Sequence, residues 1–194
     1  MGGYLGLNNK KIHARKCTIQ ELTNNEMKLF LNENHLQGYI PASVNIALIY
    51  NNEIVSALTF VKARYNKKIQ WELLRLATKI NTNISGGIQR LWKHFISTYH
   101  PTSIVSYCDL RWFTGKIYSK LGFLKKNTSK PSYWYTNYKI RYHRSAFTKQ
   151  KCLRLAKAKN PQLDLIGLTE KKLTRDFLDL HRIWDCGQIT WIWQ

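Results

Sequence analysis

The stretch Thr114-Gly115-Lys116-Ile117-Tyr118-Ser119-Lys120-Leu121-Gly122-Phe123 decides the fold prediction. Thr114 can cap a helix, because its hydroxyl oxygen can accept a hydrogen bond from a first-turn N–H. Ile117, Tyr118 and Leu121 recur at the spacing of a buried helix face. Gly122 suits the left-handed conformation that ends many helices. The stretch therefore predicts a short helix with a glycine stop.

A strand and a longer helix precede this stretch. The apolar run 103–108 suits a central strand. Residues 82–87 (Thr-Asn-Ile-Ser-Gly-Gly) read as a small-residue loop that leads straight into a helix. The buried face of that helix carries Ile88, Leu91, Trp92 and Phe95 at helical spacing.

Further toward the N-terminus the pattern predicts a helix and a hairpin. Thr23 and Glu26 form a capping-box signature, which predicts a helix over 23–34. Two apolar runs, 46–50 and 54–60, flank Asn51-Asn52-Glu53 and indicate a β-hairpin. The run 71–76 predicts a third strand, and the polar, basic residues 1–16 predict a flexible arm.

The C-terminal part predicts strands, a helix and a buried end. Residues 133–135 and 140–142 indicate at least one late strand, and a helix is expected from Thr169. The aromatic residues after Ile183 are too apolar to remain in water, so the end is expected to pack onto the body. The fold class is thus α/β, with a mixed central sheet flanked by helices and a C-terminal helical and aromatic extension. The expected parts are an arm over 1–16, a domain over 17–145 and an extension over 146–194.

Composition narrows the function classes. The chain has 194 residues, 31 Lys and Arg against 11 Asp and Glu, and a formal net charge of +20. Such an excess repels itself unless a polyanion neutralises it. No apolar stretch reaches the roughly 18 residues of a membrane span, and the start lacks the apolar core of a signal peptide. We expect a cytoplasmic protein without a membrane partner. Its four cysteines and six histidines are scattered, so no metal site is expected.

The charge is uneven along the chain. Residues 110–163 contain fourteen Lys and Arg, ten aromatic residues and no acid. Cations neutralise phosphates and aromatic rings stack on bases, so this region predicts nucleic-acid binding. We expect DNA rather than RNA as the partner. The alternative is a lysine-rich solvated surface over an aromatic core. The candidate nucleic-acid contacts are Arg111, Trp112, Lys116, Lys125, Lys126, Lys130, Trp134, Arg141 and Arg144.

The order of elements over residues 17–142 resembles the GNAT acyltransferase superfamily. The most specific part is Tyr118 through Phe123, which is similar to the Tyr-x-Lys-Leu-Gly-Phe phrase of that fold. The resemblance places Ser85, Gly86 and Gly87 where such proteins hold the pyrophosphate of acetyl-CoA or another acyl-CoA. The GNAT pattern Arg/Gln-x-x-Gly-x-Gly/Ala falls here on Asn83, Gly86 and Ile88, so its first and last residue types differ. The alternative for this loop is an ordinary strand-to-helix turn.

Five segments of the chain resemble one branch of that superfamily: residues 34–38, 72–75, 86–87, 107–112 and 182–187. The chain is similar to phage-encoded GNAT-like domains that occur alone or attached to homing-endonuclease-like proteins, and more distantly to Mom-type DNA-modifying enzymes. This resemblance implies a location in the host cytoplasm.

Four residues are catalytic candidates, each with a structural alternative. The resemblance implies that Tyr118 protonates a leaving thiolate, or it only packs in the core. Asp109 ends a strand, where α/β folds place their sites, and could accept a proton from an amine or orient Arg111. Glu72 could accept a proton or pair with Arg75. His35 could act as a base or cap a helix.

These observations leave rival functions open. The first is acyl transfer from acyl-CoA to an amine, most plausibly an exocyclic base amine in a single strand or a flipped nucleotide. The second is a DNA-binding module that kept the fold without catalysis. A protein that inhibits a host factor is the third.

Overall fold

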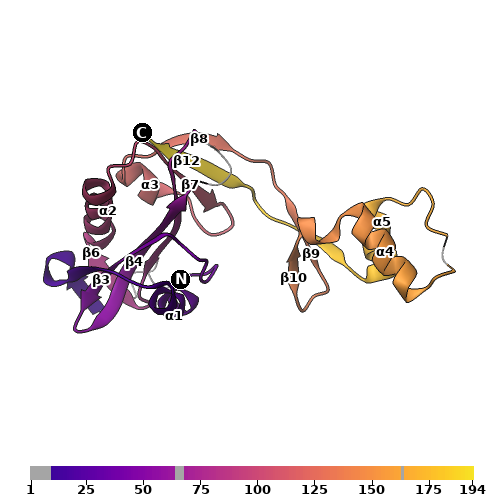
Figure 1. Ribbon diagram of the computed structural model, residues 1–194, viewed down its shortest axis with the longest axis horizontal. Helices are drawn as coiled ribbons and strands as arrows, with labels where there is room; N and C mark the ends of the chain where they lie inside the picture. The colour runs from indigo at the N-terminus through magenta and orange to yellow at the C-terminus, as the bar shows by residue number, and fades with distance from the viewer. Residues whose placement is uncertain (1–9, 64–67, 163) are drawn as a thin grey trace. The chain divides into compact units, whose positions relative to one another are not determined.

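The computed structural model describes residues 10–63, 68–162 and 164–194. The chain divides into two compact units (Figure 1). Unit 1 comprises the chain up to Cys108 together with Gly115–Asn127 and Ile189–Gln194, and unit 2 comprises Asp109–Thr114 and Thr128–Gln188. These divisions replace the predicted boundaries at 16/17 and 145/146. The chain passes between the units repeatedly, so no single composition shift marks a boundary.

Unit 1 is built on a seven-stranded sheet. Its first four strands are antiparallel neighbours, and β5 pairs with β7 in parallel. In spatial order the strands are β2 (Thr18–Glu21), β3 (Val44–Tyr50), β4 (Glu53–Lys62), β5 (Trp71–Thr78), β7 (Ile104–Asp109), β12 (Gln188–Trp193) and β8 (Leu124–Thr128).

Helices α1 (Asn24–Asn34) and α2 (Gly87–Tyr99) cover opposite faces of this sheet (Figure 1). Met27, Phe30 and Leu31 of α1 pack on three alanines that lie opposite one another on β3, β4 and β5. On the other side Phe95 of α2 stacks on Phe60 of β4, with 3.5 Å between ring centroids. The small alanines allow α1 to lie close to the sheet.

The predicted local signals of this region are confirmed. Thr23 and Glu26 form the capping box at the start of α1. Asn51 and Asn52 both have positive φ, 49° and 60°, which a two-residue hairpin turn requires and asparagine tolerates. The strands expected over 71–76 and 103–108 are β5 and β7.

The prediction of a flexible arm over 1–16 is wrong for its described part. Lys10–His13 form β1, which pairs in parallel with β6 (Thr82–Ser85), and Ala14–Lys16 form the short helix η2. Ile12 and Ala14 are buried, and Arg90 donates hydrogen bonds to the carbonyls of Ala14 and Cys17. These contacts also make 82–85 a strand rather than the expected loop. Residues 1–9 lie outside the described residues.

The helix predicted within residues 114–123 is α3 (Lys116–Lys120), and its N-cap residue differs from the prediction. Gly115, not Thr114, is the N-cap residue, with φ +77°. A Cβ atom on Gly115 would lie 2.8 Å from the indole of Trp191, so a side chain there would clash. Gly122 has φ +85°, as expected for the glycine stop.

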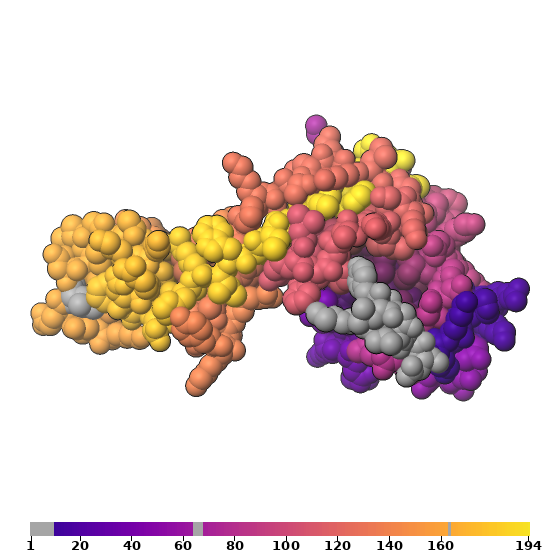
Figure 2. All heavy atoms as spheres, turned by 180° about the vertical axis from the view of Figure 1, so that it is seen from behind, coloured from indigo at the N-terminus to yellow at the C-terminus, as the bar shows by residue number. Residues whose placement is uncertain are grey.

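The aromatic end of the chain forms β12, which lies between β7 and β8. In Figure 2 this yellow strand lies among the pink and salmon segments of unit 1. The end thus supplies a strand to the sheet.

Unit 2 combines a three-stranded antiparallel sheet with helices. The sheet order is β10 (Arg141–His143), β9 (Tyr133–Thr136) and β11 (His181–Trp184). A core of Cys152, Ala156, Leu165 and Leu173 joins the helices. These are η3 (Arg144–Phe147), α4 (Lys149–Lys159), α5 (Glu170–Lys172) and η4 (Leu173–Phe177).

The helix expected from Thr169 is confirmed in its start and corrected in its length. Thr169 accepts a hydrogen bond from Lys172 N–H, but the α-helical part ends at Lys172 and continues as the π-helical η4. Within the described ranges, no helix is long and apolar enough to span a membrane.

Candidate functional site

Strands β5 and β7 diverge in the middle of the unit 1 sheet. Across the described residues they pair only through Trp71 with Ile104 and Glu72 with Val105. A bulge at Leu74 lies just beyond, because Arg75 is opposite Thr59 of β4 and Leu73 is opposite Phe60. Bulges increase the local twist of a strand. The divergence therefore separates the later parts of β5 and β7.

Arg75 lies at this divergence and connects several groups. Its Nε donates to the Gly38 carbonyl at 2.9 Å, and its Nη1 donates to the Leu74 carbonyl at 2.9 Å. Burial lowers the pKa of Arg75, and the charges of Glu72 and Tyr118 oppose that change. The guanidinium thus fixes the segment after α1 to β5. The sequence pointed to Arg75 only as a partner for Glu72.

Tyr118 of α3 interacts with Ser106 of β7 and Trp191 of β12. Burial raises the pKa of its phenol, and the phenol is hydrogen-bonded to Ser106 of β7. The Ser106 hydroxyl donates to the Leu73 carbonyl at 2.9 Å. The hydrogen bond with Ser106 lowers the pKa of Tyr118, but burial outweighs it and leaves the pKa raised. Tyr118 therefore retains its proton at neutral pH.

The ring of Tyr118 is fixed by aromatic neighbours. It stacks on Trp191 of β12 at 5.7 Å between centroids and meets the edge of Phe123 at 5.6 Å. Both interactions limit its rotation. Trp191 and Ser106 were not among the residues that the sequence singled out, because neither carries a recognisable local motif.

His35 caps α1 and faces Arg75. Its backbone N–H donates to the Leu31 carbonyl, and its Nδ1 accepts from Gln37 N–H at 3.1 Å. Burial, assisted by the charge of Arg75, lowers its pKa to about 4. The neutral ring then carries its hydrogen on Nε2. This geometry suits a hydrogen-bond donor and a cap, not the general base considered from the sequence.

Glu72 and Thr59 complete the cluster around Arg75. Glu72 is buried, with 7% of its surface exposed, and its charge acts on Arg75. Thr59 lies opposite Arg75 and is fully buried. Its hydroxyl has no hydrogen-bond partner among the residues the structure describes. A buried hydroxyl without a partner is costly and is a candidate ligand contact. We call Glu72, Arg75, Tyr118, His35 and Thr59 the Arg75 cluster.

The glycine loop forms the start of α2. Gly86 is the N-cap residue with φ +75°, no side chain caps the helix, and a Cβ atom there would have nothing nearer than Ala14 Cβ at 4.0 Å. First-turn N–H groups without intrahelical acceptors attract anions. Gly87 serves packing instead, since its Cβ would lie 2.6 Å from Ile84. Ser85 is exposed in β6.

Asp109, the fourth catalytic candidate, belongs to unit 2. It forms an ion pair with Arg111 at 2.6 Å and also accepts from the Arg111 backbone N–H. Burial raises its pKa, but the hydrogen bonds and charge of Arg111, together with the charge of Arg141, leave the pKa lowered. A carboxylate so held is a weak proton acceptor. Three of the four candidates, Glu72, Tyr118 and His35, are thus linked to Arg75 through charge, whereas Asp109 pairs with Arg111.

The candidate nucleic-acid contacts are divided between the units. Lys116, Lys125 and Lys126 belong to unit 1, and the other six belong to unit 2. Arg111 is engaged by Asp109, whereas Trp112 is 45% exposed and Arg141 lies over the ring of Trp134 at 4.5 Å. Lys125, Lys126, Lys130 and Arg144 are exposed. Unit 2 holds fourteen of the 31 Lys and Arg and six of the 11 Asp and Glu, so both units are basic.

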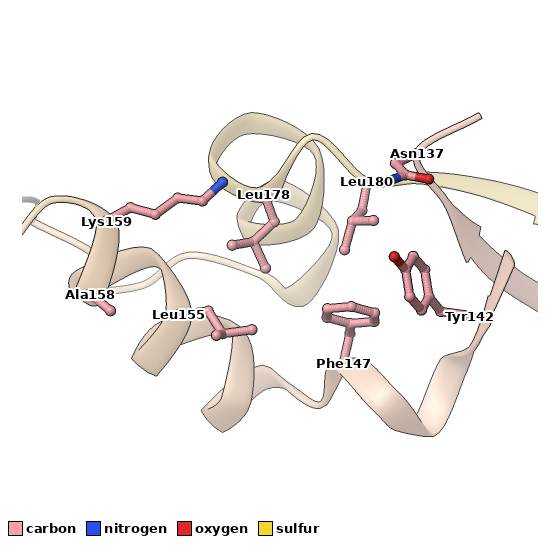
Figure 3. Close-up of a pocket in the computed structure, with 8 residues that line it drawn as sticks. All are labelled: Asn137, Tyr142, Phe147, Leu155, Ala158, Lys159, Leu178 and Leu180. Carbon is pink, nitrogen blue, oxygen red and sulfur yellow. The ribbon is translucent and has the colours of Figure 1, made fainter. Parts of the chain in front are cut away.

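Unit 2 also has a hollow of about 380 Å³ between β10, η3, α4 and the segment after η4 (Figure 3). Its lining is mostly apolar, and Lys159 at its edge donates to the Phe177 carbonyl at 3.3 Å. The hollow brings together no acid–base pair. Within the described ranges, no group of three His, Cys, Asp or Glu residues could hold a metal ion. The residues that line the hollow are Asn137, Tyr142, Phe147, Leu155, Ala158, Lys159, Leu178 and Leu180.

Comparisons with known proteins bear on the fold. No family model matches the chain, and no curated protein matches it by sequence. An acetyltransferase of Bacillus subtilis, solved in complex with CoA, is similar over 91% of this chain and 97% of its own, with a TM-score of 0.50 and 12% identity. The ribosomal-protein-S18-alanine N-acetyltransferase of Escherichia coli is similar over 59% of this chain and 81% of its own, with a TM-score of 0.48 and 14% identity. The chain has a mixed α/β fold of the GNAT acetyltransferase type.

Proposed function

We propose that this protein is an acyl-CoA-dependent N-acyltransferase that acts on nucleic acid, DNA in the first place. The observation that carries the acyl-transfer part is the divergence of β5 and β7 beside the protonated phenol of Tyr118. The sequence resemblance favours a more specific activity, that of a phage DNA-modification enzyme that acylates an exocyclic base amine.

The residues present fit an acyl-CoA. The start of α2 at Gly86 has no side-chain cap and offers backbone N–H groups to the pyrophosphate. Thr59 of β4, opposite Arg75, has a buried hydroxyl without a partner among the described residues and is a candidate polar contact. When bound, acyl-CoA supplies an acyl group activated as a thioester.

Acyl transfer needs two proton transfers, and the Arg75 cluster supplies one residue for each, Tyr118 and Glu72. Tyr118 holds a proton that it can give to a leaving sulfur; Ser106 is hydrogen-bonded to its hydroxyl, and Trp191 stacks on its ring. Glu72 is the carboxylate of the cluster and is assigned to accept a proton from the amine, directly or through water. His35 contributes a hydrogen-bond donor at Nε2. Arg75 fixes the segment that carries Gly38 and positions these groups.

The positive charge of the protein supports nucleic acid as the acceptor of the acyl group. The net charge of +20 and the exposed cations of both units favour a polyanionic partner. A base amine is accessible only in a single strand or a flipped nucleotide.

The test combines cofactor binding with turnover. Acetyl-CoA at millimolar concentration is expected to raise the melting temperature by several degrees through ligand linkage. Incubation with a single-stranded oligonucleotide should then add one acetyl group, detected by mass spectrometry. Tyr118→Phe should keep the melting shift and lose about 10²-fold or more in kcat.

Tyr99→Phe is the matched control. Tyr99 also lies in unit 1 and donates to Glu21 at 2.6 Å, outside the Arg75 cluster, so its removal should leave kcat unchanged. No melting shift and no acylated product would reject the enzyme. Oligonucleotide binding without either signal would support the second candidate, a non-catalytic DNA-binding module, which the altered glycine pattern at Asn83 and Ile88 favours.

A further inference from the structure

One face of the three-stranded sheet of unit 2 packs on the helices around Tyr135. Tyr135 of β9 is fully buried on it, packs edge-on against Phe147, and donates to Glu170 of α5. Arg182 lies on the same face and donates to the Tyr135 hydroxyl at 3.1 Å. This face joins the sheet to the helices of unit 2.

The opposite face presents a different set of side chains. Residues directly opposite on antiparallel strands lie on the same face. The register therefore places two rows of three residues there, which we call the Trp134 face. The rows are Arg141, Thr136, His181 and His143, Trp134, Ile183.

Of the π systems on the Trp134 face, Arg141 and His143 are exposed, whereas Trp134 and His181 are half-buried. The exposed Arg141 guanidinium lies over the Trp134 ring at 4.5 Å, and His143 meets the edge of that ring at 5.0 Å. Tyr138, in the turn between β9 and β10, is 79% exposed and lies 4.9 Å from the His181 ring. Ile183 is 41% exposed. Aromatic rings and guanidinium planes at a surface are the groups on which bases stack.

The Trp134 face carries positive charge and no acidic residue of its own. None of its six residues is acidic. The Asp109 charge reaches Arg141, but that carboxylate is engaged by Arg111 at 2.6 Å. Asp179 lies 3.4 Å from His181. Exposed Arg144 follows the end of β10, so cations lie along the edge of the face.

We propose that the Trp134 face binds single-stranded DNA by stacking bases on Arg141 and the aromatic rings while nearby cations contact phosphates. This inference rests on the nucleic-acid part of the proposed function and names the surface that performs it. A sheet face of this kind stacks about two or three bases. Base faces are exposed in a single strand and hidden in a duplex, so the single strand is the occupant that this chemistry selects.

The experiment measures binding of a fluorescein-labelled oligothymidylate by the full-length chain at low salt, by fluorescence anisotropy. Trp134→Leu is expected to weaken binding about tenfold, as removal of one stacking ring does. Trp134→Phe keeps a ring and should bind nearly as tightly as the unchanged protein. Arg141→Gln should weaken binding and reduce the salt dependence.

Two matched controls separate this face from general effects. Trp184→Leu removes a 62% exposed tryptophan from the opposite face of the same sheet. Lys157→Gln removes one positive charge from an exposed position on α4. Both should bind the strand like the unchanged protein, and all variants should keep its melting temperature and its acetyl-CoA shift.

The outcomes distinguish the two proposals. If the unchanged protein ignores oligothymidylate at low salt, the nucleic-acid part of the proposed function fails, and this inference with it. If it binds but Trp134→Leu and Trp184→Leu weaken binding equally, the Trp134 face is not the site while the proposed function stands. A tenfold preference for oligouridylate or for duplex DNA would overturn single-stranded DNA as the occupant.

Discussion

Arg75 shows how one residue organises the candidate site. Its two 2.9 Å hydrogen bonds join the Gly38 and Leu74 carbonyls, and its charge acts on His35 and Tyr118. A planar guanidinium can donate in several directions at once, which a lysine ammonium on a flexible chain does less well. The site is thus organised by a cation and by phenolic and imidazole groups that stay neutral.

His35 predicts a pH dependence of stability. Its pKa of about 4 in the folded protein lies below its ordinary value of 6.5, so the unfolded chain binds the proton first as pH falls. The contribution is fully present above about pH 6.5. It is lost as pH falls toward 4, with a total on the order of 2 kcal/mol after allowance for partial exposure. Urea denaturation between pH 7 and pH 5 measures it.

His35→Asn is the control for this dependence. The Asn side-chain oxygen can accept from Gln37 N–H as Nδ1 does, but it does not titrate. The variant should lose part of the pH slope. An identical slope in the two proteins would contradict the assignment.

At the scale of elements, α3 depends on a strand far along the chain. Gly115 begins α3 because Trp191 of β12 occupies the space that a side chain would need. The same strand supplies the ring that stacks on Tyr118. Helix and strand are therefore mutually dependent.

Gly115→Ala is expected to lower the free energy of unfolding by about 2–4 kcal/mol, through backbone strain and the clash with Trp191. Gly86→Ala has a similar φ, +75°, but no neighbour closer than 4.0 Å, so strain alone should cost about 1 kcal/mol. Both glycines lie in unit 1. Chemical denaturation compares the two variants, and equal losses would remove the Trp191 contact as the cause.

At the scale of the whole molecule, positive charge is shared by both units. Neither unit compensates the other, so the net charge of +20 acts on any polyanion that approaches. DNA affinity should therefore fall steeply with salt.

For roughly six phosphate contacts, the expected slope of log affinity against log salt concentration is about −4 with a single strand, against about −5 with a duplex. Titrations at several salt concentrations measure it. The triple variant Lys125→Gln, Lys126→Gln, Lys130→Gln should weaken binding to all sequences alike and flatten the slope. A flat response of the unchanged protein would contradict an electrostatic origin of binding.

The sequence by itself determined what depends on near neighbours and on composition. Four features depend only on residues close together in the sequence, so one segment is enough to predict each of them. They are the capping box at Thr23, the Asn51-Asn52 turn, the periodicity of α2 and the helix stop at Gly122. The net charge is a sum over residues and needs no fold.

Only the tertiary structure decided which distant groups meet. The pairing of β1 with β6, the placement of β12 between β7 and β8, and the contact of Trp191 with Gly115 join residues far apart in the chain. Tyr118, His35 and Glu72 became one cluster through Arg75, while Asp109 was placed with Arg111 in unit 2. Burial and close packing depend on the partner that fills the space, and that partner is not encoded in the local pattern.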